Sequence, residues 1–257
     1  MKKTIFLLLL FPFALSVLGQ KKKKPEEAFY VMDENFQGTT VEKAKYLAHA
    51  IKQTDSSWQF DTYNMYGPMI SSEHYKDEKA TTLHGEAVYF NAKGTRDSIG
   101  NFYNGLPNGS FYYFNDTGAT YLQKEFSRGI LVESIDRIKR DSTEQADAKR
   151  KKDTIKRTEI ESDFPGQQAG WIKYLTNHLV YPERAQKLQK EGSVVIQFIV
   201  DTEGHIMNPQ IVQSVEFSLD TEALRMINES PAWSPALQDG KKVKSYKKQP
   251  ITYRLSR

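Results

Sequence analysis

The residue types that most often carry catalysis or metal binding are sparse and scattered in this chain. The sequence has no cysteine, which excludes a disulfide scaffold, a thiolate metal site, a cysteine nucleophile and a lipid-modified cysteine. Phosphate-binding loops, zinc signatures and nucleophile elbows are also missing from it. No two histidines stand at metal-ligand spacing among His49, His74, His84, His178 and His205. We therefore expect no enzyme, and no bound metal or cofactor.

Main-chain hydrogen bonding is the chemistry that the last residues offer instead. The pattern from Val243 to Leu255 predicts a strand that contains Pro250. A proline removes one bond from the ladder, so this strand should lie at a sheet edge or be bulged. Its lysines can protect an open edge from self-pairing, or they can attract an acidic partner, and both interpretations stay open: Lys241, Lys242, Lys244, Lys247 and Lys248.

The strand that must support this edge is predicted from Gly192 to Val200, where most positions are apolar on both faces. Asp201 to Gly204 is a tight-turn signal, and the β pattern resumes from Ile206 to Val215, so a hairpin is expected. A helix follows from Ser218 to Ile227, with Leu219, Ala223, Leu224 and Ile227 on its apolar face.

Two further helices are expected before the hairpin. Asp163-Phe-Pro-Gly166 is a turn that leads into the first, whose buried face carries Trp171, Leu175 and the pair His178-Leu179. Tyr181-Pro182 breaks that helix. The second runs from Glu183 to Lys190 with Pro182 at its first turn and Gly192 at its end. Trp233 is expected in the core.

Eight short motifs of this region stand in an order that resembles the C-terminal domain of TonB-family energy transducers, in the form common among Bacteroidetes. They are Phe164-Pro-Gly, Tyr181-Pro-x-x-Ala185, Gly192-x-Val-x-Ile-x-Phe, Asp201-x-x-Gly204, Leu219-Asp-x-x-Ala223, Trp233-x-Pro-Ala, Gly240-Lys and Pro250-Ile-x-Tyr. The resemblance covers residues 162–257. It implies an α+β fold in which a three-stranded antiparallel sheet packs with helices.

The resemblance also implies a function. Members of this family bind a short extended segment, the TonB box, of an outer-membrane TonB-dependent transporter, and pass to it the force of an inner-membrane proton-driven motor. The implied contact is β-augmentation, in which a strand edge accepts the partner's backbone. The partner-binding residues we expect are Tyr181, Pro182, Val243, Lys244, Tyr246, Lys248, Ile251 and Tyr253. The same open edge can pair with a second copy, so a homodimer is a further expectation.

Residues 25–133 are predicted to form an all-β hairpin-repeat domain. Gly85 to Gly94 matches Gly109 to Gly118 at an offset of 24 residues, and the match continues to Gly105 and Gly129. A weaker third copy precedes them, in which Gly67 stands eight residues before Tyr75, as Gly94 does before Phe102. The pattern resembles MORN-type repeats, whose hairpins must stack to bury their aromatic faces. The aromatics either form a binding surface or only fill the stack. A short helix is expected over residues 41–52.

The first 19 residues are interpreted as a signal peptide. Met1-Lys-Lys precedes a fourteen-residue apolar run from Ile5 to Leu18, which is shorter than the roughly 20 residues of a membrane span. We expect export to the periplasm with cleavage near Gly19. An uncleaved leader would instead anchor the protein to the inner membrane.

Residues 134–161 are predicted to be a charged linker. Nine Lys or Arg alternate with seven Asp or Glu there, without aromatic residues, glycine or proline. Because acids are interleaved with bases, and the whole chain carries a net charge of only +4, nucleic acid is not expected as a partner.

Two functions remain: a transducer that couples transporters to the motor, or a non-transducing periplasmic adaptor that binds extended peptides or envelope components.

Overall fold

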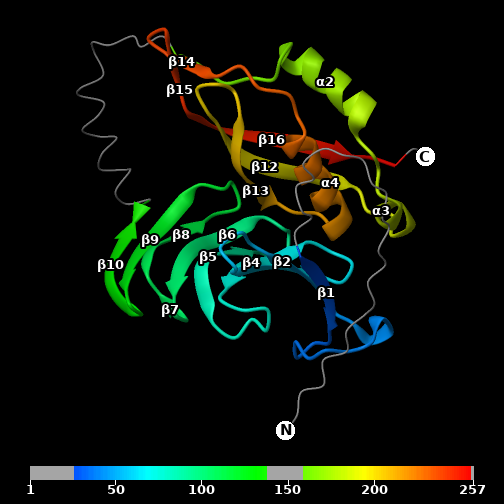
Figure 1. Ribbon diagram of the computed structural model, residues 1–257, viewed down its shortest axis with the longest axis vertical. Helices are drawn as coiled ribbons and strands as arrows, with labels where there is room; N and C mark the ends of the chain where they lie inside the picture. Colours follow the sequence, from blue (N-terminus) through cyan, green and yellow to red (C-terminus); the bar gives the residue numbers. More distant parts are fainter. Residues whose placement is uncertain (1–25, 138–158, 256–257) are drawn as a thin grey trace. The chain divides into compact units, whose positions relative to one another are not determined.

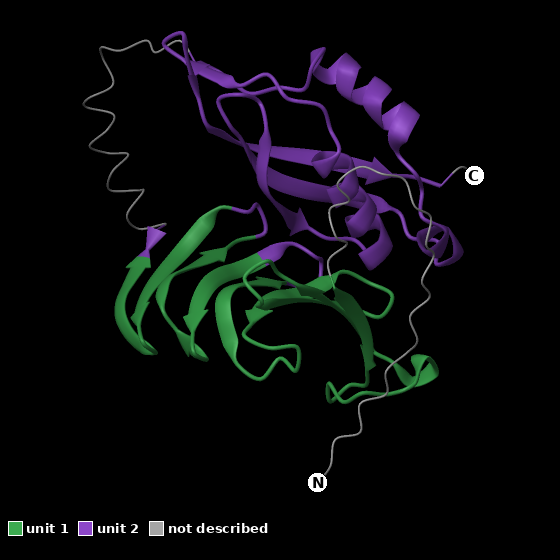
Figure 2. Cartoon of the chain, viewed as in Figure 1, with its two compact units in different colours: residues 1–90, 97–115, 119–135 green, residues 91–96, 116–118, 136–257 purple. Residues whose placement is uncertain are grey.

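The computed structural model describes residues 26–137 and 159–255. The chain divides into two compact units (Figure 2). Residues 1–90, 97–115 and 119–135 belong to unit 1, and residues 91–96, 116–118 and 136–257 belong to unit 2. The expected signal peptide and the greater part of the expected charged linker lie outside the described residues.

Unit 1 is built on one large antiparallel sheet of ten strands (Figure 1). Nine of the strands are neighbours in chain order from β1 to β10, and the short β7 adds to β6. The strands are β1 (Glu27–Met32), β2 (Tyr46–Lys52), β3 (Trp58–Asn64), β4 (Met69–Tyr75), β5 (Leu83–Phe90), β6 (Arg96–Tyr103), β7 (Leu106–Pro107), β8 (Gly109–Phe114), β9 (Thr120–Ser127) and β10 (Ile130–Asp136).

Each 24-residue repeat is one hairpin of this sheet. The first copy forms β5 and β6, and the second forms β8 and β9. The two turns close alike, because Asn91 N–H donates to the Thr95 carbonyl at 2.9 Å and Asn115 N–H donates to the Ala119 carbonyl at 3.0 Å. The weaker copy is the β3–β4 hairpin, with Gly67 in its turn.

The aromatic residues of the repeats pack against one another across neighbouring strands. The Phe111 ring lies 5.4 Å from that of Phe102 and 5.0 Å from that of Phe126. Gly100 makes this possible, since a Cβ there would lie 2.2 Å from the Phe111 ring. A second cluster joins Ala50, Trp58 and Phe60. These rings therefore fill the stack of hairpins.

The helix expected over residues 41–52 is wrong. Val41–Lys43 is a single 3₁₀ turn, η1, and Tyr46–Lys52 is strand β2. Although its alanines favour helix, β2 lies between β1 and β3 and pairs with both along its length. Tertiary pairing therefore outweighs the local propensity of this segment.

Unit 2 contains the expected α+β arrangement and an additional small sheet. Three antiparallel strands, in the order β13-β12-β16, pack with helices, and β12 is the central strand. The second sheet has the order β11-β14-β15. The elements are β11 (Glu159–Ile160), α2 (Gln167–His178), α3 (Glu183–Lys187), β12 (Gly192–Val200), β13 (Ile206–Gln213), α4 (Phe217–Asn228), β14 (Ala236–Gln238), β15 (Lys241–Val243) and β16 (Ser245–Tyr253). None of the helices described in residues 26–137 and 159–255 is long and apolar enough to cross a membrane.

Trp233 lies in the core of unit 2, as the sequence predicts. It is 2 % exposed, and its ring contacts Phe198 of β12 at 5.0 Å and Phe164 at 5.5 Å. The backbone N–H of Trp233 donates to the Gly204 carbonyl in the hairpin turn at 2.9 Å. A Cβ on Gly204 would lie 2.1 Å from the Trp233 carbonyl, so only glycine allows the turn to approach the tryptophan this closely.

Two boundaries and the exposure of one residue differ from the prediction. The final strand does not start at Val243, because the turn at Asp239-Gly240 folds β15 back onto β14 and the chain enters a new sheet after Lys244. Helix α3 ends near Lys187 rather than at Gly192, since Gln189 adopts φ 51° and Lys190 N–H caps the Ala185 carbonyl. His178, expected on a buried face, is exposed.

Candidate functional site

The open edge of the β13-β12-β16 sheet is the strongest candidate for a binding site. Strand β16 pairs with β12 in one regular register, from Gly192 opposite Tyr253 to Val200 opposite Ser245. On the other side of β16, no strand of the described residues is paired. The last long strand therefore has one bonded edge and one edge available to a partner.

Pro250 shows which backbone groups face that open edge. It lies opposite Val195 within a ladder that has no register shift, although proline has no N–H to donate. The ladder is complete only if the proline nitrogen faces away from β12. Because backbone groups alternate along a strand, the N–H and C=O groups of Tyr246, Lys248 and Thr252 also face the open edge.

The side chains of β16 alternate between the core and the surface. Ile251 and Tyr253 are 0 % and 1 % exposed, so their side chains hold the strand to the core and cannot contact a partner directly. Tyr246, by contrast, is 75 % exposed, and Lys248 is exposed as well. Of the expected partner-binding residues on β16, only Tyr246 and Lys248 therefore present both backbone and side chain.

The other expected partner-binding residues lie elsewhere. Tyr181 and Pro182 form the corner before α3, where Tyr181 packs edge-on against Tyr253 at 5.6 Å and its hydroxyl donates to the Lys190 carbonyl. Val243 belongs to β15, opposite Ala236, and Lys244 is an exposed residue between the two strands. Tyr181 therefore contacts Tyr253, whereas Val243 lies in a different sheet from β16.

The start of β16 is fixed by the segment that precedes α2. The Ser245 hydroxyl donates to the hydroxyl of the buried Ser162 at 2.9 Å, and Lys247 Nζ donates to the Ser162 carbonyl at 2.8 Å. Of the five lysines near this strand, Lys247 therefore has a structural role. Lys241, Lys242, Lys244 and Lys248 are exposed, so their charges face solvent.

Buried carboxylates support the platform beneath the edge, and the sequence reasoning missed them. Glu216 and Asp220 are both 0 % exposed. Glu216 caps α4 by accepting from Ser218 N–H at 2.8 Å, and it pairs with Arg184 of α3 at 2.5 Å. Glu216 occupies the N-cap position of α4, where Ser, Thr, Asp or Asn is the usual signal, so its role could not be identified from the sequence.

Asp220 holds the end of β13 to α4. Its Oδ1 accepts from Val215 N–H at 3.0 Å, and its Oδ2 accepts from the Ser214 hydroxyl at 2.5 Å. Burial raises the pKa of Asp220 to about 7, against these two hydrogen bonds, which lower it. The neighbouring Glu216 charge adds to the rise.

Glu222 ties α4 to the end of α2. One of its oxygens accepts from Val180 N–H at 2.8 Å, and Arg225 contacts both oxygens at 2.7 Å. The same guanidinium donates to the His178 carbonyl at 2.8 Å. Tyr253 completes the connection to β16, since its hydroxyl donates to the Leu219 carbonyl of α4 at 3.2 Å.

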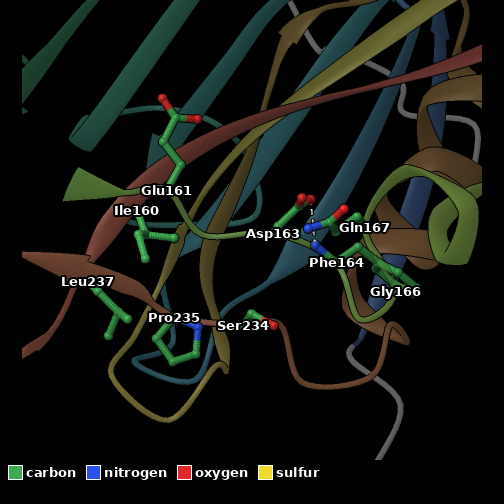
Figure 3. A pocket seen from close by; sticks show the side chains of 9 residues that line it. All are labelled: Ile160, Glu161, Asp163, Phe164, Gly166, Gln167, Ser234, Pro235 and Leu237. Atoms are coloured by element: carbon green, nitrogen blue, oxygen red, sulfur yellow. Dashed lines mark hydrogen bonds between the residues drawn. The ribbon is translucent and has the colours of Figure 1, made fainter. Parts of the chain in front are cut away.

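A pocket of about 560 Å³ lies beside the segment that anchors β16 (Figure 3). Its walls are mainly apolar, and two carboxylates stand at its rim. Asp163 accepts a hydrogen bond from Phe164 N–H at 2.8 Å, so this carboxylate has a local structural role. The lining residues are Ile160, Glu161, Asp163, Phe164, Gly166, Gln167, Ser234, Pro235 and Leu237.

Within residues 26–137 and 159–255, no three His, Asp or Glu side chains are grouped as a metal site would require. The buried carboxylates Glu216 and Asp220 hold secondary-structure elements together and have donors on the protein itself. These two carboxylates therefore have structural roles in unit 2.

Comparison with known proteins gives one family match. Residues 177–255 match the family described as Gram-negative bacterial TonB protein C-terminal. This part covers α3, the β13-β12-β16 sheet and α4, and it includes all eight residues expected to bind a partner. The match bears out the TonB C-terminal resemblance for that part of the chain.

One solved structure is also similar, the NMR solution structure of Helicobacter pylori TonB-CTD (residues 179–285). It is 24 % identical, covers 34 % of this chain and 78 % of that chain, and has a TM-score of 0.27. A TM-score this low carries no structural argument. No curated protein sequence matches the chain.

Proposed function

We propose that unit 2 binds the TonB box of an outer-membrane TonB-dependent transporter by adding it as a strand to β16, and that the protein supports energy transduction for nutrient import. The family match of residues 177–255 suggests a TonB-like role. The observation that carries the proposal is the open edge of β16, with Tyr246, Lys248 and Thr252 offering unpaired backbone groups. Main-chain bonds would provide affinity.

The charge of this edge supports an acidic or neutral partner strand over a basic one. The exposed lysines beside β16 attract negative charge at distances up to about a Debye length, roughly 8–10 Å at physiological salt. They also oppose pairing of β16 with the β16 of a second copy, because like charges would come together. A homodimer through β16 is therefore the weaker of the two uses of this edge.

The Tyr246→Pro variant tests strand addition, with Tyr246→Ala as its matched control. Both variants remove the exposed ring, but only proline removes the N–H at the open edge. Measured by fluorescence anisotropy with TonB-box peptides, we expect Tyr246→Pro to weaken binding at least tenfold more than Tyr246→Ala. Equal affinities of the two variants would rule out backbone pairing here. If the unmodified protein binds none of the peptides, the proposed partner is wrong.

The second candidate is a periplasmic adaptor that binds extended peptides or envelope components without transmitting force. The sequence feature that favours it is the short leader, which a signal peptidase would remove. The repeat sheet of unit 1, proposed to be MORN-like, would then serve as an additional contact in the cell envelope. In a transducer, the retained leader would instead engage the inner-membrane motor.

N-terminal sequencing of the protein from the cell envelope separates the two candidates. A mature chain that starts at Gln20 or Lys21 cannot contact the motor through its own membrane segment, so the adaptor would remain. A chain that retains residues 1–19 would favour the transducer. Peptide binding by β16 is expected in both cases, so this experiment tests force transmission alone.

A further inference from the structure

Strand β10 exposes three consecutive large aliphatic side chains. Ile130 is 72 % exposed, Leu131 is 49 % exposed and Val132 is 64 % exposed. Successive residues of a strand point to opposite faces, so both faces of the strand are apolar here. Isolated apolar residues are common on protein surfaces, but three adjacent ones on an outer strand form a continuous apolar edge.

The backbone of β10 is also available for pairing. The strand bonds to β9, and no other described strand pairs with it. Natural sheets protect such edges with charged side chains, proline or a bulge; in β10 the charged residues are Glu133 and Asp136, and the run from Ile130 to Val132 contains none of these features. An unprotected apolar strand edge is complementary to another β-strand that is apolar on both faces.

We propose that β10 pairs antiparallel with β10 of a second copy of this chain, so that the two repeat sheets continue into one another across a two-fold axis. A second β10 is a complementary partner, because it offers the same apolar residues and the same unpaired backbone that the first strand needs. A two-fold contact of this kind closes after two copies, which leaves no apolar edge exposed.

The charges on β10 disfavour one register of this contact, and we place the two-fold axis one residue earlier, at Val132. A two-fold axis at Glu133 would set two carboxylates directly opposite each other, which destabilises a strand pair. An axis at Val132 places Leu131 opposite Glu133 and Ile130 opposite Ser134. This register brings all three exposed aliphatic residues into the contact and sets no like charges opposite each other. The side chains of Val132 from the two copies then meet at the axis.

Pairing of β10 with β1 of another copy is the alternative. Such a contact joins different surfaces and leaves a free β10 and a free β1 at the ends, so it produces open-ended assemblies. Moreover, β1 begins with Glu27, which pairs with His49 at 2.8 Å, and Phe29 is stacked on the His49 ring. Its side chains are therefore already engaged within unit 1.

Disulfide cross-linking tests the proposal, because the chain has no cysteine of its own. Val132→Cys in the full chain should form disulfide dimers under mild oxidation. Leu131→Cys should do so at least tenfold more slowly, since its two copies would lie diagonally across the axis. Tyr246→Cys is the control on the edge of β16, at a residue that is 75 % exposed. If Val132→Cys cross-links no faster than Tyr246→Cys, the proposal fails.

Val132→Lys provides a second measurement. This residue is largely exposed, so the substitution should leave the circular dichroism spectrum unchanged, while two like charges would face each other at the axis. By light scattering after size exclusion, we expect the unmodified chain at twice its monomer mass and the variant as a monomer. A monomeric unmodified chain, or a variant that still dimerises, would overturn the proposal. A ladder of larger species would instead indicate pairing of β10 with β1.

Discussion

Strands β16 and β10 are both outer strands of antiparallel sheets, but their sequences manage the edge in opposite ways. One face of β16 is anchored in the core by Ile251 and Tyr253, while Pro250 interrupts the donors of its open edge and lysines surround it. In β10 the aliphatic side chains are exposed and no lysine or proline protects them. Both strands leave backbone groups unpaired, but only the open edge of β16 is protected against self-pairing by lysines and a proline.

This difference indicates which partner each edge can accept. A strand protected by charge and proline resists its own kind and remains available to a chain of different composition. An unprotected aliphatic strand edge favours pairing with another strand, and its own sequence offers the most similar surface. The two edges can therefore serve different contacts of the same protein, a transporter segment at β16 and a second copy at β10.

The largest effect on stability is expected from truncating an isoleucine to alanine, with the buried Ile251 of β16 compared with the exposed Ile130 of β10. Ile251→Ala removes a fully buried side chain and should cost about 2–5 kcal/mol of the free energy of unfolding. In the Val132→Lys background, where the chain is expected to be a monomer, Ile130→Ala at a residue that is 72 % exposed should change the free energy of unfolding by less than about 0.5 kcal/mol. Urea unfolding with a probe for each unit checks this pair. Similar costs for both would mean that β10 is covered within its own chain.

A smaller effect is expected from Asp220, which lies in the support of β16. Its folded pKa is raised by burial to about 7 from an ordinary value of 3.8. Between these values the folded state binds a proton that the unfolded state has lost, so the stability of unit 2 should fall as pH rises from about 4 to 7. Asp220→Asn keeps the shape and removes the titration.

The free energy of unfolding measured at several pH values checks this prediction. Asp220→Asn should remove a decrease of the order of a few kcal/mol, since one pKa unit corresponds to about 1.4 kcal/mol. Ser214→Ala removes one hydrogen bond that stabilises the charged form, so it should raise the pKa of Asp220 further and extend the decrease to higher pH. A slope that survives in Asp220→Asn would assign the pH dependence to other groups.

The smallest effect is expected from the charge on the edge. Lys248→Glu should weaken the binding of an acidic extended peptide several-fold and reduce its salt dependence, because an exposed charge acts mainly through long-range attraction. Lys173→Glu on α2 is the matched control, with the same change of charge at another exposed residue. If both variants weaken binding equally, the net charge of unit 2 matters and the position of Lys248 does not.

Much of the fold could be predicted because its signals are local. The Asp201 to Gly204 turn fixes a hairpin, the spacing of Leu219, Ala223 and Ile227 fixes an amphipathic helix, and Pro250 implies an edge strand. The 24-residue repeat likewise predicts hairpins. Each of these depends on neighbours within a few residues, or on one backbone property of a single residue type.

The wrong predictions lie where pairing with a segment distant in sequence determines the secondary structure. The helix expected over residues 41–52 became β2 because β1 and β3 pair with it from both sides. The strand expected from Val243 was divided because Leu237 and Ala236 bind the part before Lys244 into another sheet. A local pattern contains no information on which segment will compete for its backbone groups.

The candidate site shows the same division. The sequence by itself limited the last strand to a sheet edge or a bulge, because a proline within it cannot complete a two-sided ladder, and it showed that lysines surround the strand. Only the tertiary structure decided that Ile251 and Tyr253 are core residues while Tyr246 and Lys248 are accessible. The physical reason is that burial depends on what α4 and β12 place against each face, and this contact exists only once the chain has folded.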